Sequence, residues 1–241
     1  MKELPIPLLP LLVLALILGA IGCGDRGEIP TPTLAPTATP SGGAEGALPI
    51  LNVGDKWVSV VTDKGIEYTR TTEVIGEDAV DGKDCYVVEE SFEPPFRGIV
   101  SSVTQKWEKA TMLPTTVESS GEYIDMPYVA VISVSCEFPD GLPFPLEVGK
   151  EYKVIWTESR TLTTMGETQT EIATYVYTHK VEKMEQITVP AGTFRCFKQV
   201  KYDEDGTALS TSWYSDSTKS SVKLIDYETG DVAVLVSYSL R

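Results

Sequence analysis

Residues 66–91 read IEYTRTTEVIGEDAVDGKDCYVVEES. Two runs rich in Val, Ile, Thr and Tyr, residues 66–75 and 84–91, flank the dipeptide Asp81-Gly82. Asp-Gly between such runs is typical of a β-hairpin, because Gly accepts the positive φ that a tight turn requires. This stretch therefore predicts two antiparallel strands joined by a short turn.

The same pattern continues in both directions from this hairpin. Turn signals follow at Lys64-Gly65, Asp140-Gly141, Asp205-Gly206 and Thr229-Gly230, and only residues 107–112 could hold a helical turn. We expect an all-β fold, a strongly curved antiparallel sheet that forms a half-barrel or an open barrel or sandwich. The predicted strands cover residues 56–62, 66–75, 84–91, 100–107, 113–119, 123–135, 151–164, 168–182, 194–203, 207–214, 220–226 and 231–240.

Landmarks in the first half of this region recur in the same order in the second half. This order predicts two tandem related β units, one at about 50–136 and one at about 146–241, joined by residues 137–150. Convergent strand composition is the alternative explanation. The matched landmarks are Leu51-x-Val53-Gly54 with Leu146-x-Val148-Gly149, Cys85-Tyr86 with Cys196-Phe197, Trp107 with Trp213, and Val129–Ile132 with Val232–Leu235.

The amino terminus predicts export. Residues 4–22 carry no charged side chain, and three prolines in the first half make the run resemble a signal peptide more than a membrane-spanning helix. The segment 18–23, LGAIGC, resembles the bacterial lipobox, so we expect a signal peptide at 1–22 and lipid attachment at Cys23. An uncleaved anchor is the alternative. Residues 23–49 are rich in Pro, Thr and Gly and predict a linker.

Charge and composition exclude several kinds of partner. The net charge of -15 disfavours a nucleic-acid surface, because phosphate contacts need clustered Lys and Arg. The single histidine, His179, excludes a His-rich metal site, and phosphate-cradling and dinucleotide motifs are absent. Acidic groups at 89–93 and 203–205 could hold a hard cation, but solvated turn charge explains them as well. We therefore expect no metal and no cofactor.

The motif Val189-Pro-Ala-Gly-Thr-Phe-Arg-Cys196, followed by Trp213-Tyr214 and Val222-Lys223, resembles uncharacterised bacterial envelope lipoproteins built on a domain of unknown function. Those proteins are similar to the half-barrels of lipoprotein-localisation factors. The resemblance covers about residues 146–226, and it departs at 215–221, where an expected glycine is missing. It implies a curved antiparallel sheet with an apolar concave face and carries no information on activity.

Three cysteines remain in the folded region, so one internal disulfide at most can form there. The proposed repeat pairs Cys85 with Cys196, and an exported protein permits oxidation. Buried free thiols are the alternative.

Aromatic residues on predicted strands supply the candidate ligand-binding positions. Tyr175, Tyr177 and His179 alternate along one strand face, where they form either a ligand-lined stripe or a packed sheet face. The tryptophans either fill the core or line a groove. The candidate ligand-binding residues are Trp57, Trp107, Tyr175, Tyr177, His179 and Trp213.

No nucleophile elbow is present, so the sequence favours a protein that is not an enzyme; a hydrolase would need His179 beside an acid and a nucleophile in a cleft. We expect an envelope lipoprotein, held in the cell membrane or outer membrane by acyl chains on Cys23, that binds an apolar molecule in the concave sheet. The alternative is a structural module that contacts another envelope protein and binds no small ligand. A cavity of a few hundred Å³ with apolar walls separates the first from the second, which predicts a filled core.

Overall fold

A computed structural model describes residues 45–97, 99–123 and 126–241. The predicted signal peptide, Cys23 and most of the linker lie outside these residues. The strands are β1 (Lys56–Asp63), β2 (Ile66–Val80), β3 (Lys83–Phe96), β4 (Val100–Glu108), β5 (Pro114–Tyr123), β6 (Met126–Glu137), β7 (Glu151–Thr164), β8 (Glu167–Val189), β9 (Gly192–Tyr202), β10 (Ala208–Ser215), β11 (Ser220–Asp226) and β12 (Val232–Ser239). The described residues contain no helix, and therefore none long and apolar enough to cross a membrane.

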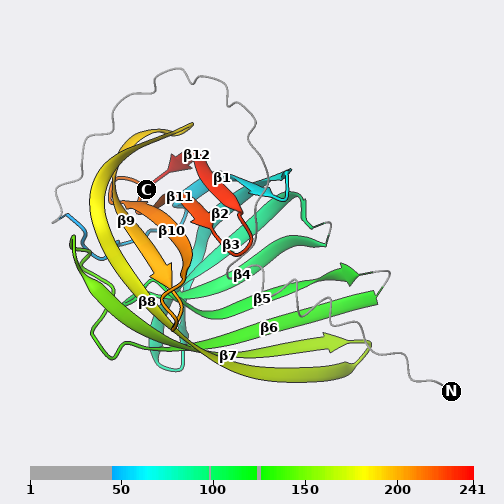
Figure 1. Cartoon of the computed structure of the whole chain (residues 1–241). Coiled ribbons are helices and arrows are strands. Elements are labelled where there is room, and N and C mark those ends of the chain that lie inside the picture. The colour runs from blue at the N-terminus through cyan, green and yellow to red at the C-terminus, as the bar shows by residue number, and fades with distance from the viewer. Residues whose placement is uncertain (1–44, 98, 124–125) are drawn as a thin grey trace.

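The twelve strands form one closed antiparallel barrel in which each strand pairs with its neighbours in sequence (Figure 1). This confirms the all-β, curved antiparallel prediction. The sheet goes further than a half-barrel or open barrel, because β12 returns to pair with β1 from Thr62↔Val232 to Lys56↔Ser239. Closure leaves neither terminal strand with an unpaired edge.

Local turn chemistry explains why the predicted hairpins form. At the β2–β3 turn, Asp81 and Gly82 have φ of 50° and 80°, the two positive values that a tight hairpin turn needs. Several strands outrun their predicted ends, notably β2, β3 and β8, because polar residues in an exposed strand do not interrupt its hydrogen bonding. Residues 107–112, where a helical turn was possible, hold the turn of the β4–β5 hairpin, in which the Met112 N–H donates to the Glu108 carbonyl four residues earlier at 2.8 Å.

Three apolar clusters fill much of the molecule. The first comes from β2 to β7 and includes Val117 and Ile132, both 0% exposed. The second contains Trp57, Val88 and Trp213, and the third joins β8, β9 and β10 to Leu146 in the segment between β6 and β7. The space that these clusters leave open is the candidate site.

The two halves share local features that a duplication predicts. The Gly54 N–H donates to the Val74 carbonyl at 2.7 Å, and the Gly149 N–H donates to the Val181 carbonyl at 2.8 Å. Each of these valines is followed by a register shift, in β2–β3 and in β8–β9. The register pairs Tyr86 with Trp107 and Phe197 with Tyr214, so the counterpart of Trp107 is Tyr214 and Trp213 lies one position away. The duplication itself stays a prediction.

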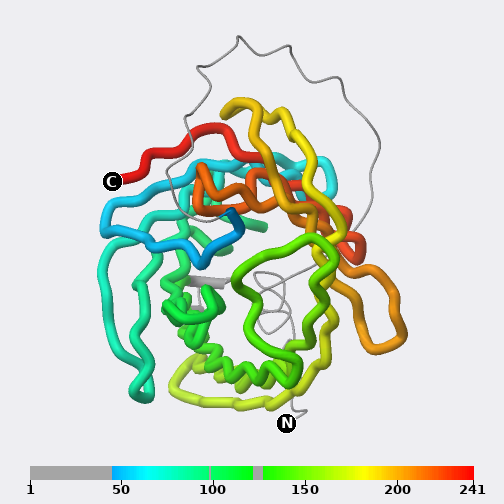
Figure 2. Tube along the Cα trace, turned by 90° about the vertical axis from the view of Figure 1, so that its left-hand side faces the viewer, coloured from blue at the N-terminus to red at the C-terminus, as the bar shows by residue number. Residues whose placement is uncertain are grey.

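The described segment is closed on itself. All twelve strands of the closed barrel lie within residues 45–241, and the red carboxyl-terminal strand lies beside the blue and cyan start of the barrel (Figure 2). The Arg241 N–H donates to a carboxylate oxygen of Asp55 at 2.6 Å, so the two ends of the barrel wall are tied together.

Candidate functional site

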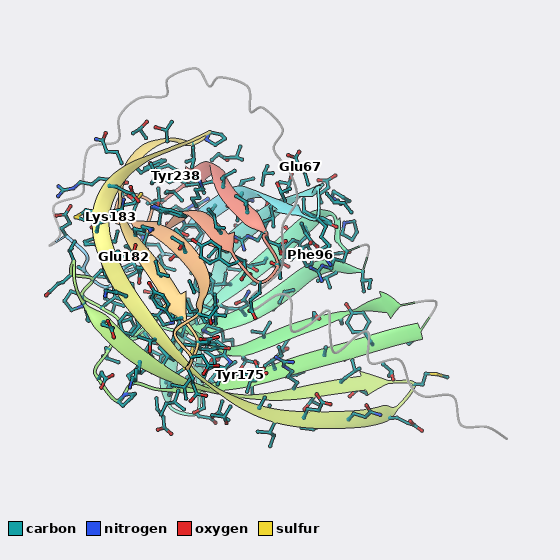
Figure 3. The ribbon with its side chains drawn as sticks, viewed as in Figure 1. Glu67, Phe96, Tyr175, Glu182, Lys183 and Tyr238 are labelled. Atoms are coloured by element: carbon teal, nitrogen blue, oxygen red, sulfur yellow. The ribbon has the colours of Figure 1, made fainter. Side chains whose placement is uncertain are left out.

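A cavity of about 560 Å³ opens inside the barrel between strands β1 to β3 and β7 to β12. Its wall contains aromatic side chains together with basic and acidic ones. The aromatic lining residues are Phe92, Phe96, Trp156, Tyr175 and Tyr177; the basic ones are Arg70, Arg160 and Lys201; the acidic ones are Glu90, Glu158, Asp203, Asp226, Glu228 and Asp231. Phe96 and Tyr175 are labelled in Figure 3 and come from strands that are not neighbours in the sheet.

Strand β7 supplies an ordered row of cavity side chains. Trp156, Glu158 and Arg160 alternate along β7 and therefore project from the same face of the sheet. Glu158, which is 2% exposed, forms an ion pair with Arg160 and accepts a hydrogen bond from the Trp156 indole N–H at 3.2 Å. The buried Nε of Arg160 has no hydrogen-bond partner among the described residues.

Lys201 of β9 faces the same cavity beside β8. Its Nζ lies 3.6 Å from the centre of the Tyr177 ring, and Tyr177 stacks on Tyr175 with ring centres 5.9 Å apart. Burial lowers the pKa of Lys201, against the opposing effect of Asp226, Glu228 and Glu158. Within the described ranges, no carboxylate lies within ion-pair distance of its Nζ, which lies over the Tyr177 ring.

Arg70 reaches the cavity from β2. It alternates with Tyr68 and Thr72, both buried, and thus shares their inward face. Its Nε is buried and finds no hydrogen-bond acceptor in the part of the chain that the structure describes. Arg70 and Arg160 therefore each hold a buried Nε–H without an acceptor among the described residues.

The acidic wall residues are only partly satisfied, because Asp231 Oδ1 is buried without a hydrogen-bond partner among the described residues. Glu90 accepts a hydrogen bond from the Thr72 hydroxyl at 3.3 Å, and Asp203 accepts one from the Thr207 N–H at 2.7 Å. Asp226 accepts from the backbone N–H groups of Glu228 and Thr229, each at 3.0 Å. Burial nevertheless raises the pKa of Asp226.

One acid lies where two strands meet at the barrel wall. Asp231 precedes β12 and lies opposite Asp63 in the continued β1–β12 register. Burial and then the charge of Asp63 raise the pKa of Asp231 to about 6. Asp63 in turn accepts a hydrogen bond from the Arg97 Nε at 2.6 Å, which ties the β3–β4 turn to the end of β1.

The sequence-predicted ligand residues divide into two groups. Tyr175 and Tyr177 line the cavity. Trp57, Trp107 and Trp213 do not; they pack in or against the second apolar cluster, where their indole N–H groups donate to the Thr218 carbonyl, Gln105 and Glu185. For these three the core alternative describes the structure.

His179 lies on the same strand face as Tyr175 and Tyr177 but beyond the cavity wall. Its ring stacks on Tyr152 with centres 5.1 Å apart, and Lys201 is its cross-strand neighbour. Burial and then the Lys201 charge lower the pKa of His179 to about 3. The neutral imidazole is thus part of the packing.

His179 provides a clean pH prediction, because it is the only histidine. Its pKa falls from 6.5 in the unfolded chain to about 3 in the fold, so the native state rejects a proton that the unfolded chain accepts. The contribution of the neutral His179 ring to the free energy of unfolding is complete above pH 6.5 and is lost progressively as the pH falls toward 3. We expect the ring carbon NMR signal to stay fixed from pH 8 to about 4.5; a midpoint near the ordinary value would contradict the packing.

The predicted Cys85–Cys196 disulfide is not formed. Cys85, Cys136 and Cys196 are all free thiols, and the first and last are buried. The barrel explains this, because β3 and β9 are six places apart in the closed order of twelve strands, as far apart as two strands can lie. Each buried Sγ instead donates to the carbonyl two residues earlier, in Lys83 and Phe194. Burial raises the pKa of Cys196 to about 12 and of Cys136 to about 11.

Sequence reasoning missed the charged half of the wall. Arg70, Glu158, Arg160 and Lys201 occupy inward strand positions, which alternation with buried neighbours could have indicated once the strand faces were known. Among the described residues, no group of three or more His, Cys, Asp or Glu side chains could hold a metal ion.

Comparison with known proteins adds a family and two distant structures. A family model described as DUF3108-like matches residues 101–221, just over half of the 241 residues. No curated protein shows a significant match. A "putative lipoprotein" from Parabacteroides distasonis ATCC 8503 is 12% identical over 82% of this chain and 100% of that chain, with a TM-score of 0.37. A "putative exported protein with YmcC-like fold" from Bacteroides fragilis NCTC 9343 is 10% identical over 81% of this chain and 100% of that chain, with a TM-score of 0.39.

Proposed function

The chain belongs to the DUF3108-like family, and from that membership, the export leader and the barrel cavity we propose that it is a lipid-anchored envelope protein that binds a small molecule. Acyl chains on Cys23 hold it to the membrane, and residues 23–49 space the barrel from the surface. It binds without catalysing a reaction.

The cavity is the observation that carries this proposal. A purely structural module would have a filled interior, whereas this barrel keeps about 560 Å³ free between β1–β3 and β7–β12. Volumes of that order are typical of small-molecule sites.

The chemistry of the wall changes the kind of ligand that the sequence predicted. A concave face lined by apolar residues would favour a purely apolar molecule. Here rings such as Trp156 and Tyr175 line the same cavity as Arg70 and Lys201, so the ligand has a ring or apolar part and also polar groups. A fully apolar molecule would leave the charged groups desolvated and unpaired.

The absence of catalysis has its own support. The lone imidazole, His179, stacks on Tyr152 with a pKa of about 3, which makes it a poor general base near neutral pH. The free thiols lie outside the cavity wall, and burial raises the pKa of the Cys196 thiol to about 12.

Native mass spectrometry of the full chain, purified in detergent from its own host and released from micelles, tests the proposal. We expect a bound species that adds the mass of one small molecule beyond that of the acyl chains. Ser210 lines the cavity, so Ser210→Trp should remove that extra mass by occupying the space.

Ser237→Trp is the matched control, because Ser237 is exposed on β12 and does not line the cavity. This variant should retain the extra mass. A wild-type chain that carries acyl chains and nothing more, under conditions that preserve its folded charge-state distribution, would overturn the binding role.

A further inference from the structure

We propose that Asp63 and Asp231 share one proton across the β1–β12 seam and that loss of this proton, as the pH rises, loosens the seam beside the cavity. The β1–β12 seam is the pairing of Ser59–Thr62 with Val232–Leu235, and the two acids lie at its end. The shared proton concerns how the barrel closes and does not depend on whether a ligand binds, so it goes beyond the proposed function.

Two carboxyl groups lie together at the end of this seam. Asp63 is the last residue of β1 and Asp231 comes just before β12, so the register that pairs Thr62 with Val232 places the two acids opposite each other. Asp63 Oδ1 and Asp231 Oδ1 are both buried, and neither has a hydrogen-bond donor among the described residues. Two carboxylates cannot bond to each other, whereas a carboxylic acid can donate to a carboxylate. One proton held between the two groups therefore supplies the missing donor.

The surroundings of the pair favour this arrangement. Burial, the charge of Asp63 and a hydrogen bond to Asp63 raise the pKa of Asp231 to about 6, against the opposing effects of the Thr229 hydroxyl and the Arg97 charge. The two carboxyl groups are thus within bonding range. Arg97 Nε donates to the other oxygen of Asp63, Oδ2, at 2.6 Å. Asp63 is accordingly the carboxylate of the pair, and Asp231 is the acid that carries the proton.

Other charged groups line the cavity, or the hollow that Asp63 and Arg97 line, on the elements next to the pair. They are Lys64 in the β1–β2 turn, Arg70 on β2, Glu90 on β3, and Asp226 and Glu228 in the β11–β12 turn. Of all charged groups, Asp63 and Arg97 act most strongly on Asp231, the first raising its pKa and the second lowering it. Loss of the proton therefore leaves two like charges side by side, which Arg97 offsets only in part.

The seam is short where this repulsion acts. A β-bulge lies between Val58 and Ser59, so only four register pairs separate the bulge from the two acids. On its other side, the start of β12 pairs with β11 through three residues, Val232 to Val234. A segment held by so few pairs can open locally without unfolding of the whole barrel. We therefore expect the repulsion to open the start of β12 first.

The same part of the seam forms a portion of the cavity wall. Val61 pairs with Ala233 across the seam, and both residues line the cavity together with Asp231. Opening of this pair therefore widens the wall. Acid keeps the wall closed, and a neutral medium relaxes it. Where the cavity holds a ligand, as in the proposed function, entry and release become easier as the pH rises.

Carbon NMR of the side-chain carboxyl groups in residues 45–241, which contain all twelve strands, tests the shared proton. We expect Asp231 to titrate with a midpoint near pH 6 in the wild type. Asp63→Asn should lower this midpoint by about one pH unit or more, because the amide removes the like charge and can donate to the Asp231 carboxylate. Asp203→Asn is the matched control, since Asp203 also lines the cavity; this variant should leave the midpoint in place.

Two results of this titration would overturn the pairing. One is a wild-type midpoint for Asp231 at the ordinary value of about 4. The other is a midpoint that stays near 6 in Asp63→Asn, because burial alone would then account for the shift.

Hydrogen exchange of the backbone amides tests the loosening and needs only the wild-type sequence of the same segment. Local opening returns Asp231 from a pKa of about 6 to its ordinary value of 3.8. The protection factors of the amides that pair across the seam should therefore fall about tenfold from pH 5 to pH 7 and stay level from pH 7 to pH 8. Asp231→Asn should remove this pH dependence. The amides that pair β6 with β7, around Val131 and Thr161, are the internal control and should show no such fall.

The results for the seam and for the ligand are separable. Seam protection that is equal at pH 5 and pH 7 in the wild type would overturn the loosening. A bare native mass of the full chain would overturn the binding function and leave the seam result standing.

Discussion

Replacement of Cys23 by Ala is expected to abolish incorporation of labelled palmitate into this chain and to leave the leader uncleaved. The residues just before Cys23, Leu18 to Gly22, are small or apolar and resemble the site at which lipoprotein leaders are removed. Each buried methylene of an acyl chain contributes about 0.8 kcal/mol, so a multiply acylated Cys23 anchors the protein stably. The effect is all or none, because no other residue offers a free amino-terminal cysteine after cleavage.

Metabolic labelling and the intact mass check this expectation together. The wild-type chain should lack residues 1–22 and carry acyl chains, whereas Cys23→Ala should carry the leader and no label. Cys136→Ala is the matched control, since Cys136 is partly buried on β6 and should leave labelling unchanged. If the leader is an uncleaved anchor, both wild type and Cys23→Ala will keep Met1 and neither will incorporate palmitate.

The fold could be predicted from the sequence because its information is local. Turn dipeptides such as Asp81-Gly82 and Lys64-Gly65 require positive φ, and each lies where two strands reverse. Closure of the barrel was not predictable in the same way. It depends on the pairing of β12 with β1, which lie at opposite ends of the folded region. No residue pattern within either strand indicates which strand it pairs with.

The candidate site was only half predictable for a related reason. Tyr175 and Tyr177 stand out as alternating aromatic residues, and the structure places both in the cavity wall. Arg160 lies between Ser159 and Thr161, and Arg70 between Thr69 and Thr71, so in sequence each resembles a solvated residue on a polar strand. Which face of such a strand turns inward depends on its cross-strand partners, and those follow from the register alone.

The tryptophans illustrate the converse error. Trp57, Trp107 and Trp213 are large and lie on strands, which suits a groove as well as a core. In the structure each indole N–H finds an acceptor inside the protein, for example Thr218 O at 2.7 Å from Trp57 Nε1. These three rings pack in or against the second apolar cluster and do not line the cavity, and no sequence pattern indicates that packing.

Asp55→Ala is expected to destabilise the barrel strongly, by about 3 to 5 kcal/mol, the usual cost of removing one partner from a buried ionic network. Asp55 is 0% exposed at the entry to β1. Its carboxylate accepts hydrogen bonds from the Asn52 N–H at 2.9 Å and the Arg241 N–H at 2.6 Å, and it pairs with Lys219 Nζ at 3.3 Å. One side chain thus joins the start of the sheet, the β10–β11 turn and the chain beyond β12.

Alanine at this position would leave two backbone donors and a largely buried ammonium without their acceptor, and each unpaired group adds a desolvation cost. Asp55→Asn should cost less, because the amide keeps one oxygen acceptor and the same shape. The comparison is Glu73→Ala, which breaks the exposed Lys56–Glu73 ion pair on the neighbouring strand and should cost about 0 to 1 kcal/mol. Urea unfolding of residues 45–241 measures all three. If Asp55→Ala loses no more stability than Glu73→Ala, the pairing of β1 with β12 holds the barrel closed without this carboxylate.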